Sequence, residues 1–504
     1  MLHKALFVVF FGVIGFIYLM GVQTDMTWIG LGADQFDYVM SSEHMTATRP
    51  TGYPLYILLG WLFERLPGNP FWALGLLSAV SIVGSAMVIY FMVKYLTKGN
   101  RVGAYAGAAT FVGGLLIWSQ GVIAETYAPT TLFMLLVVYL VFTKHYRWAA
   151  LCFGLGMGLH HLVIFAFIPV VIYAWWMQRK GLARFRWPVL AVLCAFGALV
   201  YLQCLLCVQF PPETTNGTSA LFIQTTGSLP MAYQLPLQST FDRLEEFLFV
   251  LFVDIGVGLP ALFFIRRSKG VTREINFLIL ITLLIATYYF FSFPPQWIRY
   301  LVPAIGFACV LIGVGVANFP VRGSRVLFIV LPLVALGCNL AFFDIGRSVD
   351  PAPTTARQLY TEMSQVPDGA IVYTSMWGHG WLVAYKYCMD TDWRVVLVNQ
   401  GGILYYPHWY RKEIERRGVV MPEEYPGFEG SYYKEWVWAY PSFDREAFIV
   451  ELCKANPDRA MYVTVLEEYN DEEVVFGIKP VVHDVGGDWL VPTVTGDISR
   501  LPGV

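Results

Sequence analysis

Long apolar runs recur along this chain up to residue 343, and they constrain its fold more than any other feature. A helix that spans a bilayer needs roughly 20 apolar residues, with about 17 as the lower limit. Eleven stretches are candidates: 4–22, 71–94, 102–118, 126–143, 147–160, 161–177, 187–208, 246–265, 275–292, 301–319 and 325–343. The short stretches 147–160 and 161–177 meet at His160–His161, so they form either a tight hairpin or one bent helix.

Composition agrees with a membrane protein. The chain is 57% hydrophobic and 14% charged, whereas soluble proteins carry about a quarter of charged residues. A net charge of −2 without a basic block gives no sign of nucleic-acid binding. The sequence contains no P-loop, no GxGxxG after a strand, no HExxH and no GxSxG, which argues against a nucleotide-driven pump, a Rossmann oxidoreductase and a zinc protease. We therefore predict a polytopic α-helical membrane protein.

The distribution of cations predicts the orientation of the helices. With a cytoplasmic N-terminus, the segments on the cytoplasmic side hold sixteen Lys and Arg residues and the opposite loops hold four. Such a bias is the usual mark of cytoplasmic loops. Eleven spans then place the first loop, residues 23–52, and everything beyond the last span outside the cytoplasm. That side faces the exterior of a prokaryotic plasma membrane or, in a eukaryote, the lumen of the endoplasmic reticulum.

The composition changes beyond residue 345. Gly369–Thr374, Trp393–Val398 and Ala460–Val465 have the pattern of buried strands, and Gly380–Cys388 has that of a helix. Strands that alternate with helices indicate a parallel sheet. We therefore divide the chain into a transmembrane domain, residues 1–345, and a C-terminal extracytoplasmic α/β domain, residues 346–504.

A polar stretch, Gly32–Tyr56, separates the first two apolar runs. It contains Asp34, Asp37 and Arg49, and an apolar segment, Tyr53–Leu66, follows. That segment is predicted to be a helix that lies at the surface or leads into the second span. The two aspartates are either solvated loop acids or members of a site.

The predicted topology brings further polar residues to the same membrane face. Ionisable residues at membrane depth are costly and usually face an internal cavity or a partner. Besides the first-loop acids, they are Glu125, His160, His161, Asp254 and Arg299. Because five separate turns contribute to this face, a site is expected there.

Each of these residues also has a structural interpretation. Glu125 precedes a predicted span, where a carboxylate suits the helix N-terminus, and we expect capping together with a role in the site. If His160 and His161 share one helix, they point about 100° apart; one is then a buried hydrogen-bond donor and the other a ligand contact. Arg299 either snorkels to the membrane surface or contacts a phosphate, for which its guanidinium is well suited.

Several short motifs, in order along the chain, resemble those of one known family. RPTGYPLY at 49–56 is similar to H-P-P-G-Y-P-L-Y, and WSQ at 118–120 with ETY at 125–127 is similar to W-S-Q…E-x-Y. GLGMGLHH at 154–161 and YLVP at 300–303 are similar to G-L-x-x-G-x-H and Y-F-L-P. The chain thus resembles the GT-C glycosyltransferases, and most closely the transmembrane O-mannosyltransferases that modify IPT domains, with their bacterial relatives.

The resemblance implies a function and a set of site residues. It implies transfer of one sugar, with inversion, from a polyprenyl-phosphate donor to an acceptor hydroxyl of a protein, glycan or lipid. The donor is a substrate, and no cofactor or metal is expected. The family's first-loop signature reads roughly D-S-G-E-F, but Gln35 stands where its Glu would fall, so both Asp34 and Asp37 remain candidates for the general base. The expected substrate-binding residues are Arg49, Tyr53, Glu125, Tyr127, His160, His161, Arg299 and Tyr300.

A different function class is also compatible with these residues. A transporter or flippase of a lipid-linked sugar or a small solute could use Asp254 and the histidines to relay protons. Transporters usually contain internal repeats, and none is visible here. They also rarely carry an external C-terminal domain of this length.

Overall fold

The computed structural model describes residues 2–24, 35–45, 53–66, 69–203, 237–267, 270–291, 298–342, 365–374, 395–399, 411, 414–423, 444–469, 473–483 and 489–492. The chain forms two compact units. The first comprises Met1–Asp25, Ser41–Cys207 and Ser228–Ser348, and the second comprises Met26–Met40, Val208–Gly227 and Val349–Val504. The boundary between the two units falls within helix α2 (Gln35–His44), between Met40 and Ser41. The predicted division into a transmembrane domain, residues 1–345, and an extracytoplasmic domain, residues 346–504, stays a prediction.

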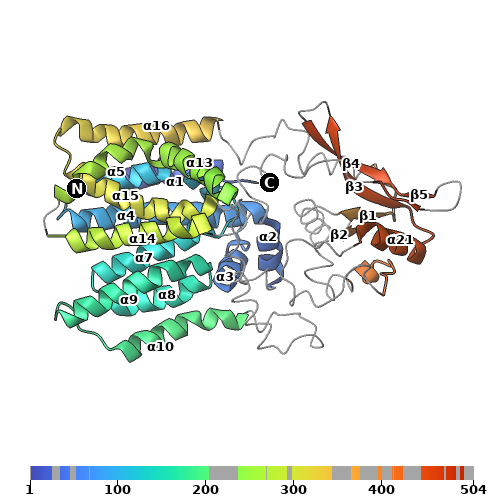
Figure 1. Ribbon diagram of the computed structural model, residues 1–504, viewed down its shortest axis with the longest axis horizontal. Coiled ribbons are helices and arrows are strands. Elements are labelled where there is room, and N and C mark those ends of the chain that lie inside the picture. The colour runs from blue at the N-terminus through green and yellow to red at the C-terminus, as the bar shows by residue number, and fades with distance from the viewer. Residues whose placement is uncertain are drawn as a thin grey trace. The chain divides into compact units, whose positions relative to one another are not determined.

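The first unit is a bundle of helices that lie side by side, with α10 and α16 at opposite edges (Figure 1). Its α-helices are α1 (Leu2–Gly21), α3 (Pro54–Phe63), α4 (Pro70–Leu96), α5 (Arg101–Gly113), α6 (Leu115–Gly121), α7 (Tyr127–Phe142), α8 (Tyr146–Met157), α9 (Ile164–Arg179), α10 (Trp187–Ala198), α13 (Leu237–Ile255), α14 (Thr272–Phe291), α15 (Val302–Ala317) and α16 (Leu327–Phe342). The 3₁₀ helices are η2 (His161–Val163), η3 (Leu199–Tyr201), η5 (Gly256–Arg267), η6 (Ile298–Leu301) and η7 (Gly323–Val326).

Each of the eleven predicted stretches contains a helix. Within the described residues, seven helices are long and apolar enough to cross a membrane, and the bent pair α5–α6 makes eight if it counts as one span. Three further apolar helices are shorter: Pro54–Phe63, Tyr127–Phe142 and Trp187–Tyr201. The protein is a multi-pass integral membrane protein, and the count of eleven crossings stays a prediction. At His160–His161 the chain leaves α8, turns and forms η2 before α9 begins.

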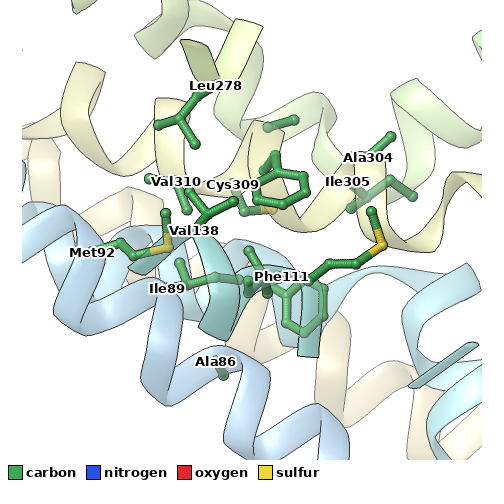
Figure 2. Close-up of a cluster of buried hydrophobic side chains, with 14 of the residues drawn as sticks. Ala86, Ile89, Met92, Phe111, Val138, Leu278, Ala304, Ile305, Cys309 and Val310 are labelled. Atoms are coloured by element: carbon green, nitrogen blue, oxygen red, sulfur yellow. The ribbon is translucent and has the colours of Figure 1, made fainter. Parts of the chain in front are cut away.

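Helix α15 lies at the centre of the bundle and packs against α4, α5, α7 and α14. Its residues are almost all buried. Figure 2 shows side chains of α4, α5, α7 and α14 gathered around Ala304, Ile305, Cys309 and Val310 of α15. These contacts are purely apolar, so they stabilise the bundle without defining a chemical site.

Glycines allow α5 and α15 to approach closely. A Cβ at Gly103 would lie 2.5 Å from the carbonyl oxygen of Gly313, and one at Gly107 would lie 2.7 Å from that of Cys309. Both distances are too short for a carbon atom. Small residues four positions apart let helix backbones meet in membranes, and both helices carry such a pair here.

A break separates α5 from α6, where the helix axis bends by 70°. A bend exposes backbone groups that must find partners in a membrane interior. The carbonyls of Val112 and Gly113 accept hydrogen bonds from Tyr18 Oη (3.0 Å) and Asn339 Nδ2 (3.1 Å). On the other side of the break, the N–H groups of Leu116 and Ile117 donate to Asp254 Oδ1 at 3.0 and 3.3 Å. Side chains from three other helices therefore stabilise the break.

The second unit contains a four-stranded sheet in the order β2-β1-β3-β4. The strands are β1 (Ile371–Thr374), β2 (Val396–Asn399), β3 (Met461–Tyr469) and β4 (Glu473–Pro480), and helix α21 (Arg445–Ala455) precedes β3. Strand β1 runs parallel to both neighbours, with Ile371 opposite Val396 and Met461, while β4 is antiparallel to β3. Strands β5 (Val482–His483) and β6 (Trp489–Leu490) form a separate pair.

Strands β1, β2 and β3 occupy the positions at which three strands were predicted. Residues 371–373 of β1 are buried, as expected for a strand with parallel neighbours on both sides. The predicted helix Gly380–Cys388 lies outside the described residues. The extracytoplasmic location of this unit stays a prediction.

Candidate active site

Seven of the ten predicted site residues lie together in the first unit. Asp34 and Arg49 fall outside the described residues, and Asp37 lies on α2 with a side chain that is not described. The structure therefore does not distinguish between the two candidate bases. The seven residues form one contact network: Tyr53, Glu125, Tyr127, His160, His161, Arg299 and Tyr300.

An ion pair between Glu125 and Arg299 is the most polar feature of this network. Arg299 Nη1 lies 2.6 Å from Glu125 Oε1, and the two side chains are 9% and 0% exposed. Removing both charges from water is costly, and the attraction offsets this cost only when the geometry is good. Arg299 is thus held inside the bundle, which does not fit the alternative in which it snorkels to the membrane surface. The predicted phosphate contact stays a prediction.

Glu125 lies in the short connection between α6 and α7, and its backbone is held from both sides by one serine of α4. The Ser78 hydroxyl donates to the Glu125 carbonyl at 3.2 Å, and the Glu125 N–H donates to Ser78 Oγ at 3.4 Å. The carboxylate oxygen Oε2 accepts the N–H of Thr126 at 3.3 Å, just ahead of α7. This bond fits the predicted capping role, while the other carboxylate oxygen pairs with Arg299.

The adjacent histidines are not on one helix, so of the two alternatives left open by the sequence, the chain turns between them. His160 has extended backbone angles (φ −166°, ψ 144°) and precedes η2, in which His161 is the first residue. This change of direction brings the two ring centroids to 4.2 Å, instead of spreading them around a helix. The helix ends within the segment Gly154–His161, whose three glycines weaken it.

Tyr53 packs against the first histidine from the side of α3. The N–H of Leu55, in the first turn of α3, donates to the carbonyl of Gly158 at 2.8 Å. This bond fixes the start of α3 beside the end of α8, and the Tyr53 ring stacks on His160 at 5.5 Å. Tyr53 itself has φ 41° and ψ 46°. A left-handed backbone is unfavourable for a non-glycine residue and is often found at functional sites.

Tyr127 connects the histidines to the ion pair. Its ring lies 5.3 Å from Arg299 Cζ, within the range of a cation–π contact. The same ring lies 5.0 Å from His160 and 5.6 Å from Tyr300. The Tyr127 ring therefore lies between the buried arginine, which is paired with Glu125, and the rings of His160 and Tyr300.

Two residues of the site were missed by the sequence analysis. Tyr288 of α14 has its hydroxyl 3.0 Å from His161 Nε2, and its ring lies 5.4 Å from that of Tyr300. Ser78 holds Glu125, as described above. Tyr288 belongs to the tyrosine pair at 288–289 near the end of a predicted span, which marks an interfacial position. Ser78 lies in an apolar run and gives no comparable signal.

Asp254 has a structural role in the described contacts, because it holds the two N–H groups that begin α6. This helix leads directly to Glu125, so the carboxylate supports the site from a distance. No observation favours the proton relay of the transporter alternative. Within the described part of the chain, no three His, Cys, Asp or Glu residues lie close enough together to hold a metal ion. That the reaction needs no metal stays a prediction.

Comparisons with known proteins bear on this arrangement. Residues 34–183 match the model of the protein O-mannosyl-transferase TMEM260 N-terminal domain. A curated relative, protein O-mannosyl-transferase tmem260 of Dictyostelium discoideum, is 25% identical over 114 residues. That alignment covers 22% of this chain and 14% of the relative, so the chain matches a small part of the relative's length.

Two solved structures share the fold over nearly the whole chain. ArnT from Cupriavidus metallidurans bound to undecaprenyl phosphate has a TM-score of 0.56 at 14% identity, covering 92% of this chain and 93% of ArnT. The apo form has a TM-score of 0.57 at 12% identity, covering 95% and 98%. The chain therefore has the GT-C type of fold. Over residues 34–183, which include five of the seven clustered residues, it matches the protein O-mannosyl-transferase family, and the resemblance predicted from its motifs is confirmed.

Proposed function

We propose that this protein is a membrane glycosyltransferase that moves one sugar from a polyprenyl-phosphate donor to an acceptor hydroxyl. The observation that carries the proposal is the family match over residues 34–183, because this range includes both first-loop acids, Glu125 and both histidines. The acceptor is a protein hydroxyl by analogy with the O-mannosyltransferase relative. By the same analogy, mannose is the first sugar to test.

The polyprenyl-phosphate donor is supported by the shared fold and by the chemistry of the cluster. ArnT, which shares the fold, is known in complex with undecaprenyl phosphate. In the present chain, Arg299 can offer several N–H donors to phosphate oxygens. Its partner Glu125 fixes the guanidinium in place. A lipid tail would lie between the apolar helices of the bundle.

The proposed chemistry is a single displacement at the anomeric carbon. Asp34 or Asp37 accepts the proton of the acceptor hydroxyl as its oxygen attacks the sugar. The bond between the anomeric carbon and the phosphate oxygen breaks, and the electron pair leaves with the phosphate. Attack from the opposite side inverts the sugar. Because phosphate is already a good leaving group, positioning and neutralisation of its charge should supply most of the rate enhancement.

The reaction is proposed to take place outside the cytoplasm. This proposal is supported by the sixteen cations in segments on one side of the helices, against four on the other. The same bias assigns the N-terminus to the cytoplasm and the C-terminal unit to the extracytoplasmic side.

The proposal is tested with purified protein in nanodiscs, supplied with polyprenyl-phosphate mannose and a secreted-protein fraction as acceptor. The wild type is expected to transfer mannose to protein. One of Asp34→Asn and Asp37→Asn is expected to lower the rate by about 10²–10⁴-fold, the usual range for a general base, while the other serves as its matched control. Full activity in both variants contradicts the base assignment. No transfer by the wild type from mannose, glucose or other common polyprenyl-phosphate sugars contradicts the function.

A further inference from the structure

The two neighbouring histidines have different surroundings. The Nδ1 of His160 accepts the N–H of Leu162 at 3.1 Å, and its ring packs against Tyr53 and Tyr127. This residue shapes the turn between α8 and η2.

His161 is buried but has one ring nitrogen without a partner. The residue is 8% exposed, and its Nε2 lies 3.0 Å from the Tyr288 hydroxyl. The other nitrogen, Nδ1, is buried and makes no hydrogen bond in the structure as described. Proteins rarely bury a polar atom without a partner, and an exception calls for an explanation such as a ligand or a water molecule.

His161 belongs to the same contact network as Arg299. Its ring lies 4.2 Å from His160 and 6.3 Å from Tyr300, the residue that follows Arg299. One guanidinium is already paired with one carboxylate, so an incoming phosphate needs further donors. If the Tyr288 hydroxyl donates to Nε2, the neutral imidazole carries its hydrogen on Nδ1, which can then donate.

We propose that His161 Nδ1–H donates a hydrogen bond to the phosphate of the polyprenyl donor, next to Arg299. This inference rests on the proposed function. The donor linkage is a phosphodiester with one negative charge. When the bond to the sugar breaks, its electron pair stays on the phosphate oxygen, and the leaving group gains negative charge. A donor aimed at that oxygen stabilises the transition state more than the bound substrate, so it acts mainly on kcat.

Two substitutions separate the two nitrogens of the ring. In His161→Asn, the amide nitrogen takes the place of Nδ1 but cannot reach Tyr288. In His161→Gln, the longer side chain places an amide near Nε2, which keeps the contact with Tyr288 and loses the donor at Nδ1. Tyr288→Phe is the matched control, since it removes the tyrosine hydrogen bond and leaves the histidine in place.

The expected result is that His161→Asn keeps kcat within about tenfold of the wild type, whereas His161→Gln lowers kcat by about 10²-fold, the usual cost of a transition-state donor. KM for the donor should change little in either variant. A purely structural histidine gives the opposite ranking, because Gln preserves the link to Tyr288. The proposal is overturned if kcat falls more in His161→Asn than in His161→Gln. It is also overturned if the two variants lose kcat equally or if neither loses it.

A spectroscopic measurement on the wild type adds a readout that does not depend on activity. With ¹⁵N-labelled histidine, undecaprenyl monophosphate should shift the Nδ1 resonance of His161, assigned by its absence in His161→Asn, while phosphatidylglycerol at the same concentration should not. An unchanged resonance, as expected if water occupies the site, overturns the proposal. If the wild type transfers sugar and this resonance does not move, only the role of His161 fails. If the wild type neither transfers sugar nor binds the lipid phosphate, the proposed function fails as well.

Discussion

Glu125 and Arg299 lie 174 positions apart in the chain, yet their side chains form a buried ion pair at 2.6 Å. The Glu125 side chain is fully buried and that of Arg299 nearly so. The pair therefore stabilises the folded protein only when both members are present. Its main effect is to hold the Arg299 guanidinium at one point of the bundle.

Replacing one member of this pair should lower the free energy of unfolding strongly, whereas replacing both members should lower it less than the two single losses combined. Glu125→Gln leaves the Arg299 charge buried and is expected to lower the free energy of unfolding by about 3–5 kcal/mol. The double variant Glu125→Gln/Arg299→Met should lose less than the sum of the two single variants. A double-mutant cycle from unfolding in mixed micelles measures the coupling. Strict additivity, or a loss under about 1 kcal/mol for Glu125→Gln, would contradict this assignment.

The stability of the folded protein should depend on pH through Glu64, which lies at the end of α3 and outside the candidate spans. Burial, and next to it the charge of Glu43, raises the pKa of Glu64 to about 9. An acid whose pKa is raised on folding favours the folded state at low pH. Its contribution is complete below the ordinary pKa, near 4.5, and is lost as the pH rises toward 9. Glu64→Gln should therefore flatten the stability profile between these values.

The size of this effect should be about 1–3 kcal/mol between pH 5 and pH 8, reduced because part of the side chain meets solvent. Thermal unfolding of the detergent-solubilised protein across this range measures it. Glu451→Gln, an exposed position on α21, is the matched control. A wild-type profile that keeps its slope after Glu64→Gln would show that other groups cause it.

At the scale of elements, the contact between α5 and α15 depends on the absence of side chains. Gly107→Ala would place a carbon 2.7 Å from the Cys309 carbonyl oxygen, so we expect it to destabilise the protein by about 1–3 kcal/mol through overpacking. Gly337→Ala on α16 is the control, since nothing lies within 4 Å of its Cβ position. It should stabilise the helix by up to about 1 kcal/mol. Changes of the same sign in the two variants would contradict the packing argument.

A second prediction at this scale concerns Asp254, whose carboxylate accepts two N–H groups at the break between α5 and α6. Asp254→Asn keeps an acceptor oxygen for the N–H groups of Leu116 and Ile117. In Asp254→Leu, the new side chain is similar in size to that of aspartate but has no acceptor. The leucine variant should lose about 1–2 kcal/mol more, the usual range for a lost cap. It should also lower sugar transfer, because α6 leads to Glu125. Thermal unfolding and transfer rates of the two variants test this. If Asp254→Asn is as damaging as Asp254→Leu, a role for the charge itself, such as proton relay, regains support.

At the scale of the whole molecule, the sequence predicts the architecture well because the signals are repeated. Each apolar stretch is long, and the polar residues recur at one end of several of them, so seven site residues could be placed together before their contacts were known. Their pairing could not be predicted in the same way. Whether Arg299 meets water, a lipid phosphate or Glu125 depends on side-chain packing between distant segments. The turn at His160–His161 and the positive φ of Tyr53 likewise depend on the tertiary contacts of α3 and α8.

The central claim is that the buried network around Arg299 receives the phosphate of a polyprenyl donor. A structure of the protein bound to polyprenyl monophosphate tests it most directly. We expect phosphate oxygens at about 2.7–3.2 Å from the Arg299 guanidinium and from His161 Nδ1, with Asp34 or Asp37 on the far side of the sugar position. A phosphate bound elsewhere, with Arg299 still enclosed by Glu125 and Tyr127 alone, would contradict it.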